Sequence, residues 1–123
     1  MKEVDYLDFH DITLICENLL PGYLIRDNGL LLSALERPQM QLYGVDAYPN
    51  FPFKVAALMH SLARNHALVD GNKRLAWSAG RIFCLMNKLD IYLDVDSAES
   101  LVVGIAAGKY DLEEITRILK IER

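Results

Sequence analysis

The chain has 123 residues, which is the size of one domain and too short for two independent cores. Apolar residues make up 52% of it and charged residues 24%, so the chain can bury a core and is not a disordered polymer. Its formal net charge of −4 argues against a protein that binds nucleic acid by neutralising phosphates over its surface.

Cys16 and Cys84 stand far apart and outside any CxxC or Cys/His cluster, which excludes a disulfide scaffold and a structural zinc site. No apolar run approaches the roughly 20 residues that span a bilayer. The acidic start of the chain, Met1 to Asp5, is unlike a signal peptide. We therefore expect a soluble cytoplasmic protein, without a membrane or a direct nucleic-acid partner.

The first half of the chain predicts two helices. Apolar residues recur at helical spacing from about Asp8 to Leu20, and Pro21-Gly22 ends the pattern. Asn28 can cap a second, short helix that ends before Arg37, because a residue before proline avoids the helical region.

A loop from Pro38 to Asn50, which we call the flap, separates these helices from a second helical half. It is too long for a minimal connection and can contain short extended pieces. Asn50 is a good N-cap for a third helix, which carries an apolar stripe through Val55, Leu58, Met59 and Leu62. A fourth helix follows from about Lys73 to Asn87.

Two capping-box patterns, Asp96-x-x-Glu99 and Asp111-x-x-Glu114, predict two further helices near the end of the chain. Strand-like alternation is weak throughout. The sequence therefore predicts a single all-α domain over residues 1–123, with about six helices and a flap before the central helix pair.

The loop between the third and fourth helices, residues 66–74, concentrates the polar chemistry. Backbone N–H groups and the helix dipole make the start of the fourth helix an anion site. Gly71 allows a close approach of phosphate, and charged or amide donors follow it: Asn72, Lys73 and Arg74. These four residues are the candidate ligands of a polyphosphate.

Asp70 and His66 complete the candidate site. A carboxylate beside polyphosphate suits Mg²⁺, so Asp70 is the candidate metal ligand. An ordinary imidazole is neutral near pH 7 and can accept a hydroxyl proton, so His66 is the candidate general base. The structural alternatives are a turn role for Asp70, a helix N-cap role for Asn72, and solvated surface cations for Lys73 and Arg74.

The stretch HALVDGNKR resembles the signature of the Fic/Doc family, H-x-F-x-[DE]-x-N-[GK]-R. The residues that agree with it are His66, Asp70, Gly71, Asn72, Lys73 and Arg74. Leu68 replaces the phenylalanine of the signature, which keeps an apolar anchor of smaller area and puts the rigidity of the loop in question. The likeness to death-on-curing (Doc) toxins extends over most of the chain, for example at Ile25 to Leu30.

The resemblance implies a Fic fold and a choice between two reactions. Fic enzymes that transfer adenylyl groups carry G-N-G-R-x-x-R, where this chain has Lys73 at the second glycine and Trp77 at the final arginine. Both departures are typical of Doc proteins, which use ATP and Mg²⁺ to phosphorylate a threonine of elongation factor Tu and so stop translation. A Phd-like antitoxin, whose disordered C-terminal segment folds onto the toxin, neutralises them.

Three alternatives stay open at this point: an adenylyl transferase, a non-catalytic antitoxin-binding relic, and, less favoured, a metal nuclease. Arg64, Ser78 and Arg81 lie within reach of the site by helical spacing, although surface polarity explains them nearly as well. In the family the flap helps to align the target backbone, and the alternative is a plain connecting loop. The remaining candidates, Trp77, His10 and His60, we interpret as structural.

Overall fold

The computed structural model describes residues 3–123 and confirms an all-α domain with six α-helices. In chain order the elements are α1 (Phe9–Leu19), α2 (Asn28–Glu36), the 3-10 turn η1 (Arg37–Gln39), β1 (Gln41–Leu42), β2 (Val45–Asp46), α3 (Phe51–Arg64), α4 (Asn72–Met86), β3 (Asp90–Ile91), α5 (Val95–Ala106), α6 (Leu112–Ile118) and β4 (Ile121–Glu122). The four strands form two small antiparallel ribbons, β1 with β2 and β3 with β4.

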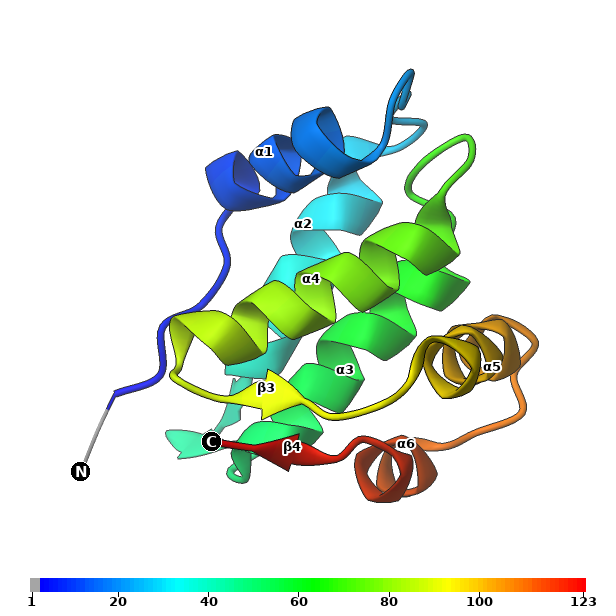
Figure 1. The fold of residues 1–123 in the computed structure, drawn as a ribbon. Helices are drawn as coiled ribbons and strands as arrows, with labels where there is room; N and C mark the ends of the chain where they lie inside the picture. The colour runs from blue at the N-terminus through cyan, green and yellow to red at the C-terminus, as the bar shows by residue number, and fades with distance from the viewer. Residues whose placement is uncertain (1–2) are drawn as a thin grey trace.

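Helix α3 is the centre of the core and packs most extensively against α4 (Figure 1). Its predicted apolar stripe is buried, and small residues flank it. Gly80 of α4 lets the two helices approach closely, because a Cβ there would lie 2.6 Å from Met59 Sδ. Helices α5 and α6, which come later in the chain, also pack against α3. The loop between α3 and α4 therefore joins two helices that are packed tightly against each other.

The expected cap of α2 is wrong by one residue, whereas that of α3 is at the expected residue. The N-cap of α2 is Asp27, whose side chain accepts a hydrogen bond from the backbone of Leu30, whereas Asn28 is already helical. An N-cap must hold an extended backbone outside the helix, and Asp27 does so with φ of −149°. Asn50 occupies the N-cap position of α3 but makes no side-chain cap bond.

The predicted capping box at Asp96 and Glu99 does not form. Asp94 caps α5 instead, with its side chain 2.7 Å from the backbone nitrogen of Ser97. Asp96 therefore lies inside the first turn of α5, and Glu99 is free for another role. The second predicted box is confirmed, since Asp111 and Glu114 bond reciprocally at the start of α6.

The flap contains a hairpin that is tied to α3. Tyr43 and Gly44 form its two-residue turn with φ values of 53° and 77°, as a type I′ turn requires. Buried Lys54 of α3 bonds the carboxylate of Asp46 at 3.1 Å and the carbonyl of Pro38 at 3.2 Å. The hairpin is therefore held against the N-terminal half of α3.

A second tie holds the flap farther along α3. Arg37 donates to Tyr48 Oη at 3.1 Å and to Ser61 Oγ at 3.1 Å, and its Nη1 lies 2.9 Å from His60 Nδ1. Burial, and then the charges of Arg37 and Arg64, lowers the pKa of His60 below its usual value. A neutral His60 can accept the guanidinium hydrogen bond.

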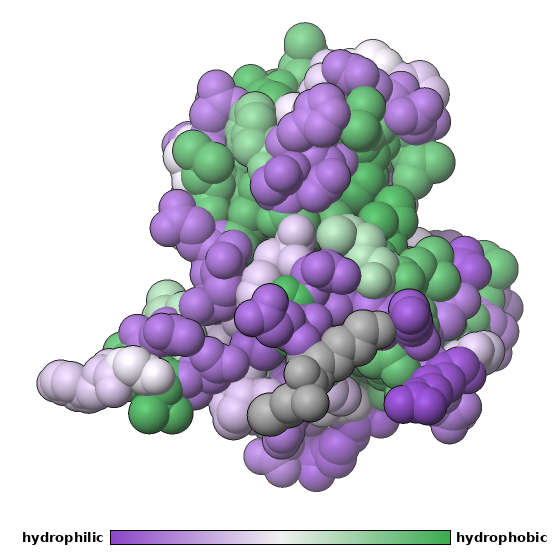
Figure 2. Space-filling view, turned by 90° about the vertical axis from the view of Figure 1, so that its left-hand side faces the viewer, coloured by the Kyte–Doolittle hydropathy of each residue, from purple (hydrophilic) through white to green (hydrophobic). Residues whose placement is uncertain are grey.

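Both cysteines are buried free thiols in the core, and burial raises the pKa of Cys84 to about 12. Within residues 3–123, no helix is long and apolar enough to cross a membrane. On the face shown in Figure 2, apolar residues gather toward the top, at the level of α1 in Figure 1. Leu14 and Leu19 of α1 are among the exposed apolar residues.

Candidate active site

The loop between α3 and α4, residues 65–71, is backed along its length by residues 24–27. The backbone nitrogens of Arg26 and Asp27 both donate to the carbonyl of Ala67, at 2.8 and 3.0 Å, and Val69 N donates to the carbonyl of Leu24 at 3.0 Å. Backbone pairing of this kind restrains a loop in one conformation. The candidate site is therefore built on a fixed backbone.

His66 has a strained backbone that Arg26 holds in place. Its φ is 51°, a left-handed value that non-glycine residues adopt rarely. Its carbonyl accepts two hydrogen bonds from the Arg26 guanidinium, 2.9 Å from Nε and 2.6 Å from Nη2. The His66 side chain is exposed and lines the main cavity of the protein. Arg26 thus fixes the point from which the imidazole projects.

Asn72 locks the buried side of the loop. Its Oδ1 accepts from the Leu68 backbone nitrogen and its Nδ2 donates to the Leu68 carbonyl, both at 3.0 Å. Leu68 itself is only 1% exposed, so leucine serves as the apolar anchor that the phenylalanine of the signature would provide. The N-cap position of α4 belongs to Gly71 and not to Asn72, whose amide is engaged with Leu68.

Gly71 turns the chain into α4. Its φ of 91° lies in the left-handed region, where a side chain would be strained. Asp70 Oδ1 accepts from the Gly71 nitrogen at 2.9 Å, so the turn role of Asp70 is present. Both residues also line the cavity.

Asp70 fits a magnesium ligand by the chemistry of its donor atoms. One carboxylate oxygen of Asp70 accepts the hydrogen bond that holds the turn, and the second oxygen remains available as a metal ligand, in an exposed side chain at the cavity. Among residues 3–123 no three His, Cys, Asp or Glu side chains cluster as a metal cage. Mg²⁺ commonly binds through one or two carboxylates together with substrate phosphates and water, which a single Asp70 satisfies.

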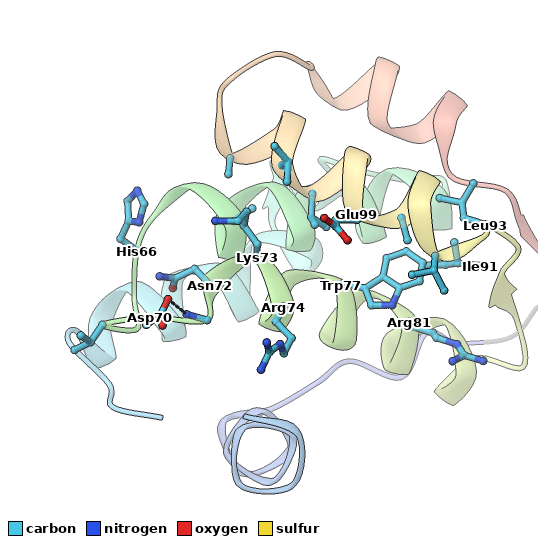
Figure 3. Close-up of a pocket in the computed structure, with 18 residues that line it drawn as sticks. His66, Asp70, Asn72, Lys73, Arg74, Trp77, Arg81, Ile91, Leu93 and Glu99 are labelled. Carbon is cyan, nitrogen blue, oxygen red and sulfur yellow. Dashed lines mark hydrogen bonds between the residues drawn. The ribbon is translucent and has the colours of Figure 1, made fainter. Parts of the chain in front are cut away.

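Lys73 and Arg74 occupy the first turn of α4, where helical N–H groups have no intrahelical acceptor. Both side chains are exposed and line the cavity. In Figure 3 Lys73 extends on the same side of α4 as His66, while Arg74 points to the side of α1. Arg74 also lines a second, smaller cavity of about 120 Å³ with residues 20–24. The two cations therefore place positive charge on two sides of the helix start.

The main cavity has a volume of about 900 Å³ and lies between the loop, α4 and α5 (Figure 3). Ligand sites usually have volumes of 300–1,000 Å³. All six predicted site residues line it, namely His66, Asp70, Gly71, Asn72, Lys73 and Arg74. The opposite part of its wall is largely apolar and comprises Trp77, Ile91, Leu93, Val95, Ala98, Val102, Val103 and Ala106.

The three residues that helical spacing left undecided have other partners or lie elsewhere. Arg64 donates to the carbonyls of Ile105 and Ala106 at the end of α5. Arg81 lines the cavity but forms a two-pronged ion pair with Asp90, at 3.0 and 3.2 Å. Ser78 is half-buried and is not part of the cavity wall.

Residue spacing did not indicate the wall opposite the loop, which includes Trp77 and Glu99, or the supporting residue Arg26. Trp77, interpreted as structural, is packed against the core on one side and also lines the cavity. Glu99 lines the cavity from α5, and Arg26 supports His66 from 40 residues away in the chain. The helical offset of four between Lys73 and Trp77 could have suggested Trp77, but no local pattern indicates Glu99 or Arg26.

The flap does not reach this cavity. None of the described residues from Pro38 to Asn50 lines it, and the hairpin packs at the other end of α3 from the loop. The flap therefore takes no part in the wall of the cavity, and its part in aligning a target backbone stays a prediction.

Comparison with known proteins connects the site to a family. The model of the Fic/DOC family matches residues 1–84. A curated protein of Mycolicibacterium smegmatis (strain ATCC 700084 / mc(2)155), named Toxin Doc, is 48% identical over 114 residues, which cover 90% of this chain and 88% of that protein.

Proposed function

The chain belongs to the Fic/Doc family, and we propose that it is a Doc-type toxin, a kinase that transfers the γ-phosphate of ATP to a threonine hydroxyl of elongation factor Tu and so inhibits translation. Membership of this family supports transferase activity in general. The observation that carries the finer proposal is the joint placement of His66, Asp70 and Lys73 on the wall of one cavity.

The proposed reaction is an in-line displacement at the γ-phosphorus. The threonine oxygen forms the new bond to phosphorus while the bond to the β–γ bridging oxygen breaks and ADP leaves. His66 accepts the hydroxyl proton. Lys73, Arg74 and the first N–H groups of α4 hold the phosphates and balance their charge.

Asp70 is the residue that would hold Mg²⁺. The ion supplies charge neutralisation at the phosphates when it is bound. Asn72 contributes by fixing the backbone of Leu68, and its Nδ2 keeps a second hydrogen that can be donated to a phosphate oxygen. Arg26 keeps the His66 backbone in its left-handed conformation, so that the imidazole is positioned before substrate arrives.

Lys73 favours phosphoryl transfer over adenylyl transfer. Its side chain occupies space at the helix start that the glycine of adenylyl-transferring enzymes leaves open, and Trp77 stands where they have an arginine. The adenylyl-transferase alternative predicts an added AMP on the target. Mass spectrometry of the modified target separates the two, because phosphoryl transfer adds one phosphate.

The decisive experiment incubates the protein with γ-labelled ATP, Mg²⁺ and purified elongation factor Tu. We expect label on the factor with the wild type, a loss of at least about a hundredfold with His66→Ala, and a comparable loss with Asp70→Asn. His10→Ala is the matched control, because His10 is an exposed histidine of α1 outside the cavity. Equal labelling by His66→Ala and the wild type would refute the proposed chemistry.

The proposed partner in the cell is a cognate Phd-like antitoxin in the cytoplasm. The matched relative is named a toxin, and proteins of that kind act with an antitoxin. Exposed apolar side chains on α1, Leu14 and Leu19, offer surface that a folding segment can cover.

Retained toxicity of a folded His66→Ala variant would favour the non-catalytic alternative.

A further inference from the structure

The wall of the main cavity changes in character along its length. At the loop end it carries cations and helix N–H groups, from Lys73 and Arg74. At the other end it is apolar, with Trp77, Ile91 and Leu93. A ligand that matches this wall has an anionic head and a flat or apolar body, which is the chemistry of a nucleotide.

Glu99 lies between these two ends. It projects from α5 toward α4, and in Figure 3 its carboxylate lies between Lys73 and Trp77. Within residues 3–123 the structure gives Glu99 no hydrogen-bond or ion-pair partner, and the helix cap that the sequence suggested for it is made by Asp94. An exposed carboxylate on a cavity wall is available to a ligand.

The position of Glu99 determines which part of a nucleotide it can meet. A phosphate beside it would be repelled, so the phosphates are directed to the cationic loop end. The next part of the nucleotide is the ribose, whose 2′ and 3′ hydroxyls are hydrogen-bond donors. A carboxylate accepts from such hydroxyls in other nucleotide sites, and charge-assisted bonds of this kind are strong.

We propose that Glu99 recognises the ribose of the bound nucleoside triphosphate, accepting hydrogen bonds from its 2′ and 3′ hydroxyls, while the base packs against Trp77 and Leu93. This inference rests on the proposed function, because it takes the triphosphate to lie at the loop. It makes Glu99 a specificity-determining residue that selects ribonucleotides over deoxyribonucleotides. It also gives the base an aromatic surface, and aromatic surfaces accept the face of any base.

Trp77 allows the test without any activity measurement. It is the only tryptophan of the chain and lines the cavity, so its fluorescence reports occupation of the site. The full chain is titrated in the presence of Mg²⁺ with ATP, with 2′,3′-dideoxy-ATP and with inorganic tripolyphosphate. The wild type is expected to bind ATP about tenfold more tightly than the dideoxy analogue.

Glu99→Ala is expected to abolish this preference, so that it binds ATP and 2′,3′-dideoxy-ATP with equal affinity. Tripolyphosphate should bind Glu99→Ala at least as tightly as the wild type, because a repulsive charge is removed. Asp96→Ala is the matched control, since Asp96 is an exposed carboxylate of the same helix outside the cavity wall. It should keep the tenfold preference.

The outcomes separate this inference from the proposed function. Binding of all three probes without a ribose preference, or a preference that survives in Glu99→Ala, overturns the role of Glu99 and leaves the phosphate site standing. A ribose preference that depends on Glu99, without label transfer to elongation factor Tu, supports the inference and refutes the proposed target. Failure of every probe to bind overturns both.

Discussion

Arg26 provides the sharpest test of how the loop works. Its guanidinium makes two hydrogen bonds to the His66 carbonyl, and the carbonyl belongs to a residue with φ of 51°. Arg26→Ala removes both bonds and leaves the left-handed conformation with less support. The imidazole should then spend part of its time away from the position needed for catalysis.

The expected magnitude follows from the exposure of the pair. Hydrogen bonds to charged groups contribute about 1.5–3 kcal/mol each, and exposed ones contribute less, so about 1–2 kcal/mol is reasonable for both together. If this free energy acts only on the loop, the active conformation becomes about 5 to 30 times rarer. The kcat of label transfer should fall by that factor, with little change in the KM for ATP.

The assay compares Arg26→Ala and Arg26→Lys with a matched surface variant, Arg117→Ala. Arg117 is 69% exposed and forms a 3.9 Å ion pair with Glu113 on α6, far along the chain from the loop. Lysine retains the charge and one donor, so Arg26→Lys should recover part of the rate. Wild-type kcat in Arg26→Ala, or an equal loss in Arg117→Ala, would refute the positioning role.

Three further predictions concern stability and the flap. The fold lowers the pKa of His60 from its usual value of 6.5, so at lower pH the unfolded chain binds the proton more readily than the folded chain, and the free energy of unfolding should decline as the pH falls below 6.5. Urea unfolding at roughly pH 7.5 and 5.5 should show a smaller decline for His60→Gln than for the wild type. An equal decline in the two proteins would contradict this role of His60. Gly71→Ala should cost about 1–2 kcal/mol because of the left-handed backbone, measured as a lower Tm; an unaltered Tm would show that the loop relaxes freely. Lys54→Met should change the free energy of unfolding by less than about 1 kcal/mol, because a well-packed apolar side chain can replace a buried ion pair at little cost. The rate of amide exchange over residues 38–50 should nevertheless rise, because methionine cannot bond Asp46. Unaltered exchange there would mean that other contacts hold the flap.

The sequence predicts best the helices that carry a long apolar stripe, such as α3 and α4. The stripe of α3 and the break at residues 69–71 locate the central helix pair. The predicted stripe of α3 is buried, although Lys54 and Ser61 of the same helix are buried as well, which helical spacing did not indicate. Errors arise at the ends, where several acceptors compete. Asp27 precedes Asn28, and Asp94 precedes Asp96, so the sequence offers two candidate caps and only the backbone conformation decides between them.

The candidate site is predictable as far as it is continuous in sequence. His66 to Arg74 form one loop and one helix start, so their approach to a common cavity follows from local structure alone. Arg26 and Glu99 reach the site from other parts of the chain through tertiary packing, about which residue spacing is silent. The same applies to Asn72, whose amide could equally have capped α4 until the backbone of Leu68 was seen to occupy it.

The wall that faces the loop has a consequence for how related proteins can diverge. The region that the family model matches ends at residue 84, whereas Ile91, Leu93 and Glu99 come from the part that follows. On the proposed roles, the proton acceptor His66 lies in the matched region, whereas Glu99, which selects the ribose, lies in the shorter segment that follows it. On the proposed role of Glu99, exchange of the segment from β3 to α5 between two homologues should transfer the ribose preference while leaving His66 unchanged.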